Sequence, residues 1–315
     1  MPKSYEKRLL LYKIETTEGT DAAPVVGTDA ILTRNLRADG FDADTKIRNL
    51  DGQYFGARPA ALTSIRQPVS FEVEIAGSGV SAVTVPAWMK LNRVCGFDAG
   101  VVVSTTHVLQ TPISASIPSA TVWPFYDNLR RQVRGTRGNV TLTFEDDEIP
   151  FFSYDMIGYP PSTLVDESTP GTPTLTAFPD PVLCSTAATT FTLGGFAAPL
   201  RRLSINAGVA LEPRSLIGPS DRVLFRNREI TGEAVIELPD LTSKNYFTNV
   251  ANRTTQVLQL IHGTVVGNIV QLDAPRAEIG LPAFSEEQGI VMMTLPLRLL
   301  PSTGAGNDEL TIQSK

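Results

Sequence analysis

Alternating apolar and polar residues define one strand of this sequence with particular clarity, between Val69 and Ala76. Its apolar residues are Val69, Phe71, Val73 and Ile75, and its polar residues are Ser70, Glu72 and Glu74. A period of two residues means that one face of the strand packs on a core, while the other faces water or an aqueous channel. We therefore expect a half-buried strand with a carboxylate-bearing face.

A short helix is expected after this strand, in the stretch PAWMKLNRVCGF that begins at Pro86. Pro86 suits the first turn of a helix, and Gly96 suits the residue that follows the last turn. Apolar residues recur at helical spacing, and they are Trp88, Leu91, Val94 and Cys95. The helix is therefore predicted to be amphipathic and to pack on the sheet.

The remaining patterns before residue 160 predict strands separated by two long polar segments. The strands cover residues 6–14, 31–41, 121–126, 138–144 and 149–159. The polar segments are an arm at residues 15–29 and an irregular excursion at residues 42–67 that has no clear period. Loops of this length inside a compact domain are uncommon, and they are often functional or become ordered against a partner.

The same order of elements recurs after residue 181. The expected strands cover residues 199–207, 233–238, 255–262, 268–272, 276–284 and 289–300, with a final edge strand at residues 308–313. A second, shorter irregular excursion covers residues 212–228. The strand at residues 233–238 alternates like the first one, and its polar face carries Glu233 and Glu237. The simplest interpretation of this order is one β-rich unit that is used twice.

A second helix is predicted after the strand at residues 233–238, in the place that the first helix takes in the first half. Asp240 is a suitable N-cap for a helix that ends near Asn252. The residues expected on its buried stripe are Phe247, Val250 and Ala251.

The stretch at residues 160–181 is rich in Pro, Thr and Ser and has no periodicity, so it is interpreted as a connector. We therefore predict a first unit at residues 1–160, a linker at 161–181 and a second unit at 182–315. The chain holds 24 Gly and 23 Pro, many of them between short alternating runs, which favours an all-β fold with minor α.

Charge and cysteine content narrow the classes of function. The net charge is −6, the pI is about 5.1, and no block of Lys and Arg stands out. A protein that binds nucleic acid tightly usually carries a basic face, so tight binding is not expected. Cys95 and Cys184 lie far apart without a partner motif, and we interpret them as free, buried thiols in a reducing compartment.

No targeting or membrane segment is predicted. The apolar run at residues 9–12 is too short for the core of a signal peptide. The longest candidate for a membrane span, residues 290–300, is interrupted by Pro296 and Arg298 and is far shorter than the ~20 apolar residues required. We expect a chain that is made in the cytoplasm and remains soluble until it assembles.

The sequence contains no convincing catalytic constellation, so we expect no enzyme, no cofactor and no metal. Each of the two histidines, His107 and His262, lies in a strand-like context without a neighbouring cluster of metal ligands. The acidic turn at residues 145–148 lacks the spacing that places oxygens around calcium. It is better interpreted as a solvated hairpin tip.

Several stretches across nearly the whole chain form a recognisable set. They are KIETTEGTDAAPV at residues 13–25, VSFEVEIAGSG at 69–79, PAWMKLNRVCGF at 86–97, the GxRGNVTLTF pattern at 135–144, DAP at 273–275 and LPLRLLPSTGAGNDELTI at 295–312. In number and order they resemble the major tail tube proteins of long, non-contractile-tailed bacteriophages. None of them is a catalytic signature.

This resemblance implies two tandem β-sandwich or barrel-like units, each with one short flanking helix, that assemble into stacked rings forming a hollow tail. Family members with one unit form hexameric rings. A chain with two units would close a ring of the same size as a trimer with pseudo-sixfold symmetry, because cyclic assemblies reuse one interface around the ring. The location implied is the virion tail, after assembly in the cytoplasm of the host bacterium.

The partners implied by the resemblance are, first, other copies of the chain, through ring closure and ring stacking. The lumen would hold the tape measure protein and later double-stranded DNA, without sequence-specific binding. The tail terminator and the distal tail protein would bind at the two ends, and no membrane is involved.

Two groups of residues are predicted to carry this function. A duct for DNA should repel phosphates weakly, and the candidates for an acidic lumen lining are Glu72, Glu74, Glu233 and Glu237. The arm at residues 15–29 and the two excursions are candidates for contacts between rings that order only on assembly. The residues singled out in the excursions are Asp42, Arg48, Tyr54, Arg58, Arg214 and Asp221.

Three alternatives stay open at this point. The nearest is a tail terminator or a distal tail protein on the same fold. The second is a carbohydrate-binding β-sandwich module, for which only Trp123, Phe125 and Tyr126 are candidate exposed aromatic residues. The third is a hydrolase on a β scaffold, and the missing catalytic constellation argues against it.

Overall fold

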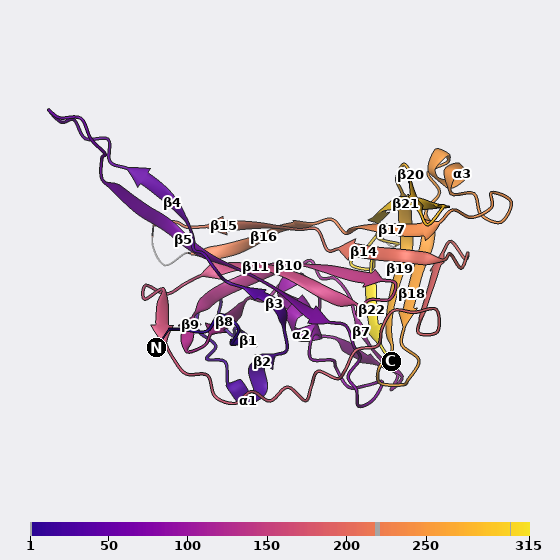
Figure 1. Cartoon of the computed structure of the whole chain (residues 1–315), viewed down its shortest axis with the longest axis horizontal. Coiled ribbons are helices and arrows are strands. Elements are labelled where there is room, and N and C mark those ends of the chain that lie inside the picture. The colour runs from indigo at the N-terminus through magenta and orange to yellow at the C-terminus, as the bar shows by residue number, and fades with distance from the viewer. Residues whose placement is uncertain (1, 218–220, 303) are drawn as a thin grey trace.

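Strands dominate the first half of the chain in the computed structural model, which describes residues 2–217, 221–302 and 304–315 (Figure 1). The strands are β1 Arg8–Ile14, β2 Ala30–Ile31, β3 Arg34–Arg37, β4 Asp42–Ile47, β5 Ala60–Glu74, β6 Val101–Val103, β7 His107–Gln110, β8 Ala120–Tyr126, β9 Leu129–Arg131, β10 Val133–Glu145 and β11 Phe151–Tyr159. The helical elements are α1 Val26–Asp29, α2 Met89–Asn92 and the 3-10 turn η1 Arg93–Cys95.

Strands also dominate the second half, so the predicted all-β class with minor α is confirmed. The strands are β12 Val165–Glu167, β13 Thr189–Leu193, β14 Leu200–Asn206, β15 Val209–Arg214, β16 Arg222–Arg228, β17 Thr231–Glu237, β18 Gln256–His262, β19 Val270–Ile279, β20 Ala283–Glu287, β21 Ile290–Leu299 and β22 Thr311–Ser314. The helix of this half is α3 Tyr246–Ala251. No barrel closes within the residues that the structure describes.

The two halves pair their strands in the same order. In the first half the antiparallel pairs run β1–β8–β10–β11–β5–β3. In the second half they run β13–β18–β19–β21–β17–β14. Each half also has a two-stranded hairpin, β4–β5 or β15–β16, and a short helix after the strand that ends in a glutamate. The proposed limits of the two units, residues 1–160 and 182–315, stay a prediction.

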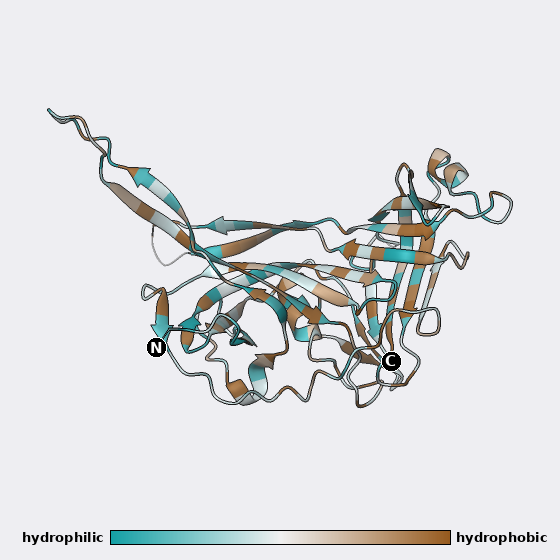
Figure 2. Ribbon diagram, viewed as in Figure 1, coloured by the Kyte–Doolittle hydropathy of each residue, from teal (hydrophilic) through white to brown (hydrophobic). Residues whose placement is uncertain are grey.

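Strand β10 joins the two halves into one continuous sheet. Its first residues pair with β8, whereas residues 141–145 pair with β14 on the same edge. The sheet therefore runs without a break through β3, β5, β11, β10, β14, β17 and β21. One apolar core cluster extends across both halves behind this sheet. Hydrophobic and hydrophilic residues alternate along its strands, as a half-buried sheet requires (Figure 2).

The first helix lies where the sequence predicts it. Trp88, Leu91, Val94 and Cys95 are all buried, and the indole of Trp88 donates a hydrogen bond to the carbonyl of Ala76. Gly96 follows η1 with a φ of 86°, in the left-handed region that glycine adopts without strain. Cys95 and Cys184 are free and buried, and burial raises the pKa of the Cys95 thiol.

The second helix begins later than predicted. Asn245, not Asp240, is its N-cap, and the Asn245 side chain accepts a hydrogen bond from the backbone N–H of Thr248. Asp240 instead starts a turn in which its backbone carbonyl accepts hydrogen bonds. The predicted buried stripe is wrong for Phe247 and Ala251, which are exposed. Val250 is half-buried and packs against the core as predicted, and Tyr246 is the buried residue of this helix.

Both predicted irregular excursions are in fact β-hairpins. Residues 42–47 pair with residues 60–66, and residues 209–214 pair with residues 222–228. The β4–β5 hairpin projects away from the body of the molecule, whereas β15–β16 lies along the first half (Figure 1). Strand β4 is almost entirely exposed, so neither face has to be apolar. The backbone of β4 pairs with β5, with one shift in register between Asp42 and Asp44. Its sequence does not alternate between apolar and polar residues, so the hydrophobic pattern did not predict this strand.

Segments outside the repeated order hold the halves together. The stretch at residues 161–181 contains β12, which pairs with β9 of the first half. Arg130 donates two hydrogen bonds to Asp166 there, and this bonding lowers the pKa of the Asp166 carboxyl group. The predicted edge strand near residues 308–313 is found as β22, which pairs on both sides, with β19 and β7. It is therefore an interior strand that bridges the halves.

Candidate functional site: a polar sheet face and two hairpins

The four acidic residues singled out from the sequence lie on one face of the continuous sheet. Directly opposed residues of antiparallel strands point to the same face, and so do residues two positions apart along one strand. One row of opposed residues crosses the joint between the halves, and it reads Glu74, Phe151, Thr143, Ser204 and Glu233. Glu72 and Glu237 lie two and four residues away from this row on β5 and β17. The apolar core lies behind the opposite face of the sheet.

The four carboxylates differ in their surroundings. Glu72 accepts hydrogen bonds from Arg34 at 2.6 Å and from Asn35 at 2.9 Å, so its charge is largely compensated. Arg34 also lies over the ring of Phe151, which holds its guanidinium group flat on the sheet. Glu233 and Glu237 are exposed.

Arginine residues share this polar face, so it is not uniformly acidic. Arg37 of β3, Arg202 of β14 and Arg298 of β21 have the same orientation as the four acids. At the joint, Glu145 lies 3.7 Å from Arg201 and 4.0 Å from Arg202. Arg201 also bonds to Glu287 at 3.0 Å. If this face lines a lumen, the four acids therefore form only part of the lining.

The six residues predicted to make contacts between rings lie on or beside the two hairpins. Asp42 is ion-paired with Arg66 of the same hairpin at 2.8 Å. Arg48, Tyr54 and Arg58 lie in the segment between β4 and β5, where Tyr54 is 80% exposed and Phe55 is fully exposed. Arg214 ends β15, and Asp221 accepts a hydrogen bond from Ser215 across the turn. The first hairpin therefore presents aromatic side chains to solvent at its tip.

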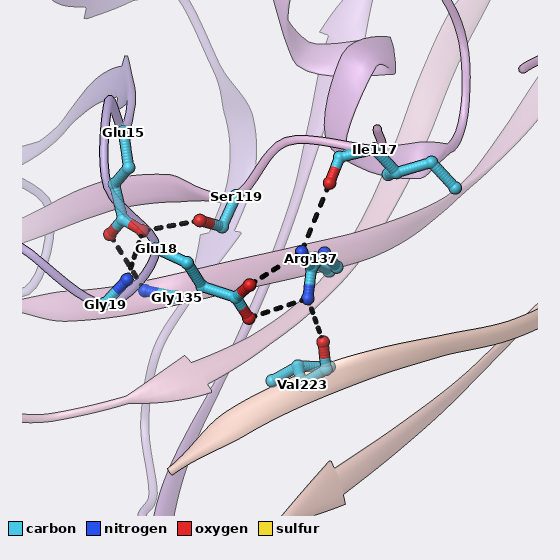
Figure 3. A network of polar contacts seen from close by, with 8 residues as sticks. All are labelled: Glu15, Glu18, Gly19, Ile117, Ser119, Gly135, Arg137 and Val223. Carbon is cyan, nitrogen blue, oxygen red and sulfur yellow. Dashed lines mark hydrogen bonds and ion pairs between the residues drawn. The ribbon is translucent and has the colours of Figure 1, made fainter. Parts of the chain in front are cut away.

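A polar network fixes the second hairpin on the first half of the chain (Figure 3). The buried carboxylate of Glu15 accepts hydrogen bonds from Ser119, Thr121 and the backbone N–H groups of Gly19 and Gly135. These bonds fix the turn that carries Glu18, whose carboxylate lies 2.9 Å from Arg137. The start of the 15–29 arm is therefore bound by contacts within its own chain.

Arg137 completes this network between the halves. It lies on β10 of the first half, and its side chain is only 11% exposed. Besides Glu18, its guanidinium group donates to the carbonyl oxygens of Ile117 and of Val223, the latter on β16 (Figure 3). A buried guanidinium group is tolerated because a carboxylate and carbonyl oxygens replace its hydration shell.

A second buried arginine fixes the other end of the same hairpin. Arg228 ends β16 and bonds to Glu309 at 2.6 Å, close to the C-terminal strand. It also donates to the carbonyl oxygens of Ile113 and Gly96, both in the first half. Sequence analysis identified neither arginine as important. Arg137 lies inside the GxRGNVTLTF pattern, directly before the predicted strand at residues 138–144. A charged residue at this place was the signal that could have indicated a buried ion pair.

The aromatic residues that a carbohydrate-binding module would expose are buried or covered, and the buried histidine makes contacts within the protein. Phe125 and Tyr126 are buried, and the ring of Trp123 is covered by Arg130 at 4.2 Å. His262 is buried, and its ring nitrogens contact Thr189 and the carbonyl of Val182. Among the residues that the structure describes, no group of three or more His, Cys, Asp and Glu side chains is placed to hold a metal ion.

None of the helices in the described ranges is long and apolar enough to cross a membrane.

These features define an all-β protein with a continuous polar sheet face and one projecting hairpin (Figure 1). The sequence matches the family model described as phage tail tube protein over residues 6–298, nearly the whole chain. The chain therefore belongs to the phage tail tube family, as the resemblance predicted. No match was found among curated proteins. Membership identifies a structural component of the virion tail that assembles with itself into the tail tube.

The arginine network leads to a prediction for stability. Replacing Arg137 with Met removes the hydrogen bonds to Val223 and Ile117 and leaves Glu18 without its partner. We expect a loss of about 2–3 kcal/mol in the free energy of unfolding of the unassembled chain, measured by guanidinium denaturation. The control is Arg226→Met on β16, the strand that carries Val223, because Arg226 and Glu212 are both more than half exposed. That change should cost at most about 1 kcal/mol. Equal losses in the two variants would contradict the role of Arg137.

Proposed function

We propose that this chain forms rings of three copies with pseudo-sixfold symmetry, and that these rings stack into the hollow tail tube of a phage with a long, non-contractile tail. The observation that supports the proposal is the strand pairing, which runs in the same order twice and is joined by β10 and β14 into one sheet. A ring built from three such chains repeats the β unit six times. Fusion of two copies halves the number of chains that a closed ring needs.

The continuous sheet supplies a wall of suitable size for a duct. Each half contributes four strands, β3, β5, β11 and β10 or β14, β17, β21 and β20, so three chains bring 3 × 8 = 24 strands. With strands ~4.8 Å apart and tilted by ~35–45°, a barrel of 24 strands has a backbone diameter of about 45–52 Å. Such a barrel has room for the inward side chains and a DNA duplex.

In the proposed tube the polar face of the sheet lines the lumen. The apolar core behind the sheet excludes the opposite face from any aqueous channel. The lining then combines Glu72, Glu74, Glu233 and Glu237 with several arginines, many of which are already paired. Paired arginines are less available to phosphates. The lumen therefore holds DNA and the tape measure protein without binding either of them tightly.

The β4–β5 hairpin is proposed to make the contact with the next ring. Its exposed tip, with Tyr54 and Phe55, is the kind of apolar surface that a partner covers. The tail terminator and the distal tail protein would meet the same surfaces at the two ends of the tube. Assembly takes place in the cytoplasm of the host bacterium.

The number of chains in the ring tests the proposal directly. The smallest closed ring should have a mass of about 102 kDa, which is three times the 34.0 kDa of the chain, by native mass spectrometry. Electron microscopy of the same preparation should show hollow tubes of stacked rings. Rings of six chains would overturn the pseudo-sixfold proposal, and rings that never stack would favour a tail terminator instead.

Reversing charges in the lumen should make the tube bind DNA. In the double variant Glu233→Lys and Glu237→Lys, two exposed acids per chain become cations that can contact phosphates. We expect tubes to assemble normally but to retain DNA at low salt, with an affinity that falls steeply as salt rises. Infectivity should drop because ejection is slowed.

The matched control for this charge reversal is the double variant Glu6→Lys and Asp180→Lys. Both residues are exposed and lie outside the sheet, and the net charge changes equally. If the control tubes retain DNA as strongly as the lumen variant, or if neither binds, the proposed orientation of the sheet is wrong.

Removing the aromatic tip of the first hairpin should separate ring closure from stacking. In the variant Tyr54→Ser and Phe55→Ser the rings should still close, because the sheet is unchanged, but electron microscopy should show few or short tubes. The control is the double variant Val265→Ser and Val266→Ser. It removes two other exposed apolar side chains, which lie between β18 and β19 of the second half. Long tubes in the tip variant would exclude this hairpin from stacking.

A further inference from the structure

Two strands at opposite ends of the continuous sheet are paired on one side only, as far as the described residues show. Strand β3 pairs with β5, and strand β20 pairs with β21. An exposed strand edge presents backbone N–H and C=O groups that can pair with another chain, so natural proteins rarely leave it uncovered.

Strand β20 occupies the same place in the second half as the end of β10 in the first half. Leu142 of β10 lies opposite Phe152, which lies opposite Val73. Phe284 of β20 lies opposite Met293, which lies opposite Ile236. Phe284 is therefore the counterpart of Leu142.

These two counterparts differ sharply in burial. Leu142 is 1% exposed, because β14 pairs alongside it and places Ile205 opposite. Phe284 is 58% exposed, and among the described residues its one ring contact is with Phe247 of α3. The same position of the repeat is covered in one half and uncovered in the other, which is the pattern expected when the covering strand belongs to a different molecule.

Strand β3 is the counterpart of the covering strand β14. Because Val73 corresponds to Ile236, Ser70 three residues earlier corresponds to Glu233. Ser70 lies opposite Arg37, and Glu233 lies opposite Ser204. Arg37 of β3 therefore corresponds to Ser204 of β14, which lies opposite Thr143 of β10.

The charges of the two free edges are complementary. Strand β20 ends in Glu286 and Glu287, whereas β3 carries Arg34 and Arg37. The joint inside the chain has the same distribution, with Glu145 on β10 and Arg201 and Arg202 on β14. Opposite charges across strands favour this pairing, and like charges would oppose the pairing of two β20 edges.

We propose that β3 of one copy pairs antiparallel with β20 of the next copy, with Arg37 opposite Ser285, so that the contact between chains repeats the joint between the two halves. This inference rests on the proposed ring and adds its partner strands and their register. In this register Leu36 lies opposite Glu286, and Glu287 lies diagonally across from Arg37.

The pairing ends with the last residue of β3, Arg37. Beyond Arg37, the backbone of Ala38 is already bonded to the side chains of Tyr126 and Arg131. Arg8 bonds to the carbonyl oxygen of Leu36, which retains a second lone pair for a neighbour. The contact between chains is therefore centred on Leu36 and Arg37 and is shorter than the five pairs of the internal joint.

A pair of cysteines tests the register. Opposed residues that do not exchange backbone hydrogen bonds have Cβ atoms about 4.5–5.5 Å apart, close to the separation that a disulfide needs. In the double variant Arg37→Cys and Ser285→Cys, mild oxidation of assembled rings should link most chains into covalent trimers on a non-reducing denaturing gel. Each single variant should remain monomeric on the same gel.

Two matched controls make the result specific. In Thr143→Cys with Ser204→Cys, the corresponding pair of the internal joint should close within one chain and give no larger species. In Arg37→Cys with Glu286→Cys, the second cysteine points to the other face of β20 and should link poorly. If the Arg37→Cys variant does not assemble, Asn35→Cys with Glu287→Cys probes the next opposed pair on the same face and leaves Arg37 in place.

The outcomes separate this inference from the proposed function. Rings or tubes that form normally but give no link in either cysteine pair, while the internal pair closes, would overturn the β3–β20 contact and leave the tube intact. Linking of the Glu286 pair as strong as that of the Ser285 pair would overturn the register. Failure of the unmodified chain to form rings of three would count against the proposed function itself.

Discussion

The pairing of β14 with the end of β10 is the constraint on which the rest of the structure depends. Five opposed pairs along residues 141–145 join the halves into one sheet and bury Leu142 and Ile205 at the seam. An unpaired backbone group in a buried seam would cost free energy comparable to a lost hydrogen bond, so the register is strongly determined. Without this seam, Glu74 and Glu233 would not share a row, and no continuous polar face would exist.

Two buried arginines fix the orientation of the β15–β16 hairpin relative to the first half, which the pairing of β10 with β14 does not determine by itself. Arg137 and Arg228 fix opposite ends of the β15–β16 hairpin on the first half, and each is bonded to a carboxylate and to carbonyl oxygens. A buried charge is stable only where its partners are correctly placed, so these contacts select one orientation of the hairpin. The β4–β5 hairpin, in contrast, projects from the body of the molecule (Figure 1), and the residues at its tip are exposed to solvent.

The sequence predicted those parts of the fold in which burial leaves a periodic record. Alternation located β5 and β17, and helical spacing with Gly96 located the first helix. The hairpins were missed because β4 has no buried face, and the start of α3 was misplaced because Asp240 uses its backbone in a turn. Alternation also gives the face of a residue but not the neighbouring strand, so the row from Glu74 to Glu233 and the seam itself could not be predicted. Arg137 was overlooked for a similar reason, since its partners lie far away in the sequence.

In the proposed tube, the mixed charge of the sheet face is compatible with a duct for DNA. At physiological salt the Debye length is about 8 Å, so side chains on the wall act on DNA only at close approach. An unpaired cation there would form contacts with phosphates and slow the passage of the genome. Pairing Arg34 with Glu72, and Arg201 with Glu145 and Glu287, holds the strands in register and leaves neither of these two cations free, while exposed Glu233 and Glu237 would add weak repulsion. In the proposed tube the same ion pairs would stabilise the wall and weaken the binding of DNA to its surface.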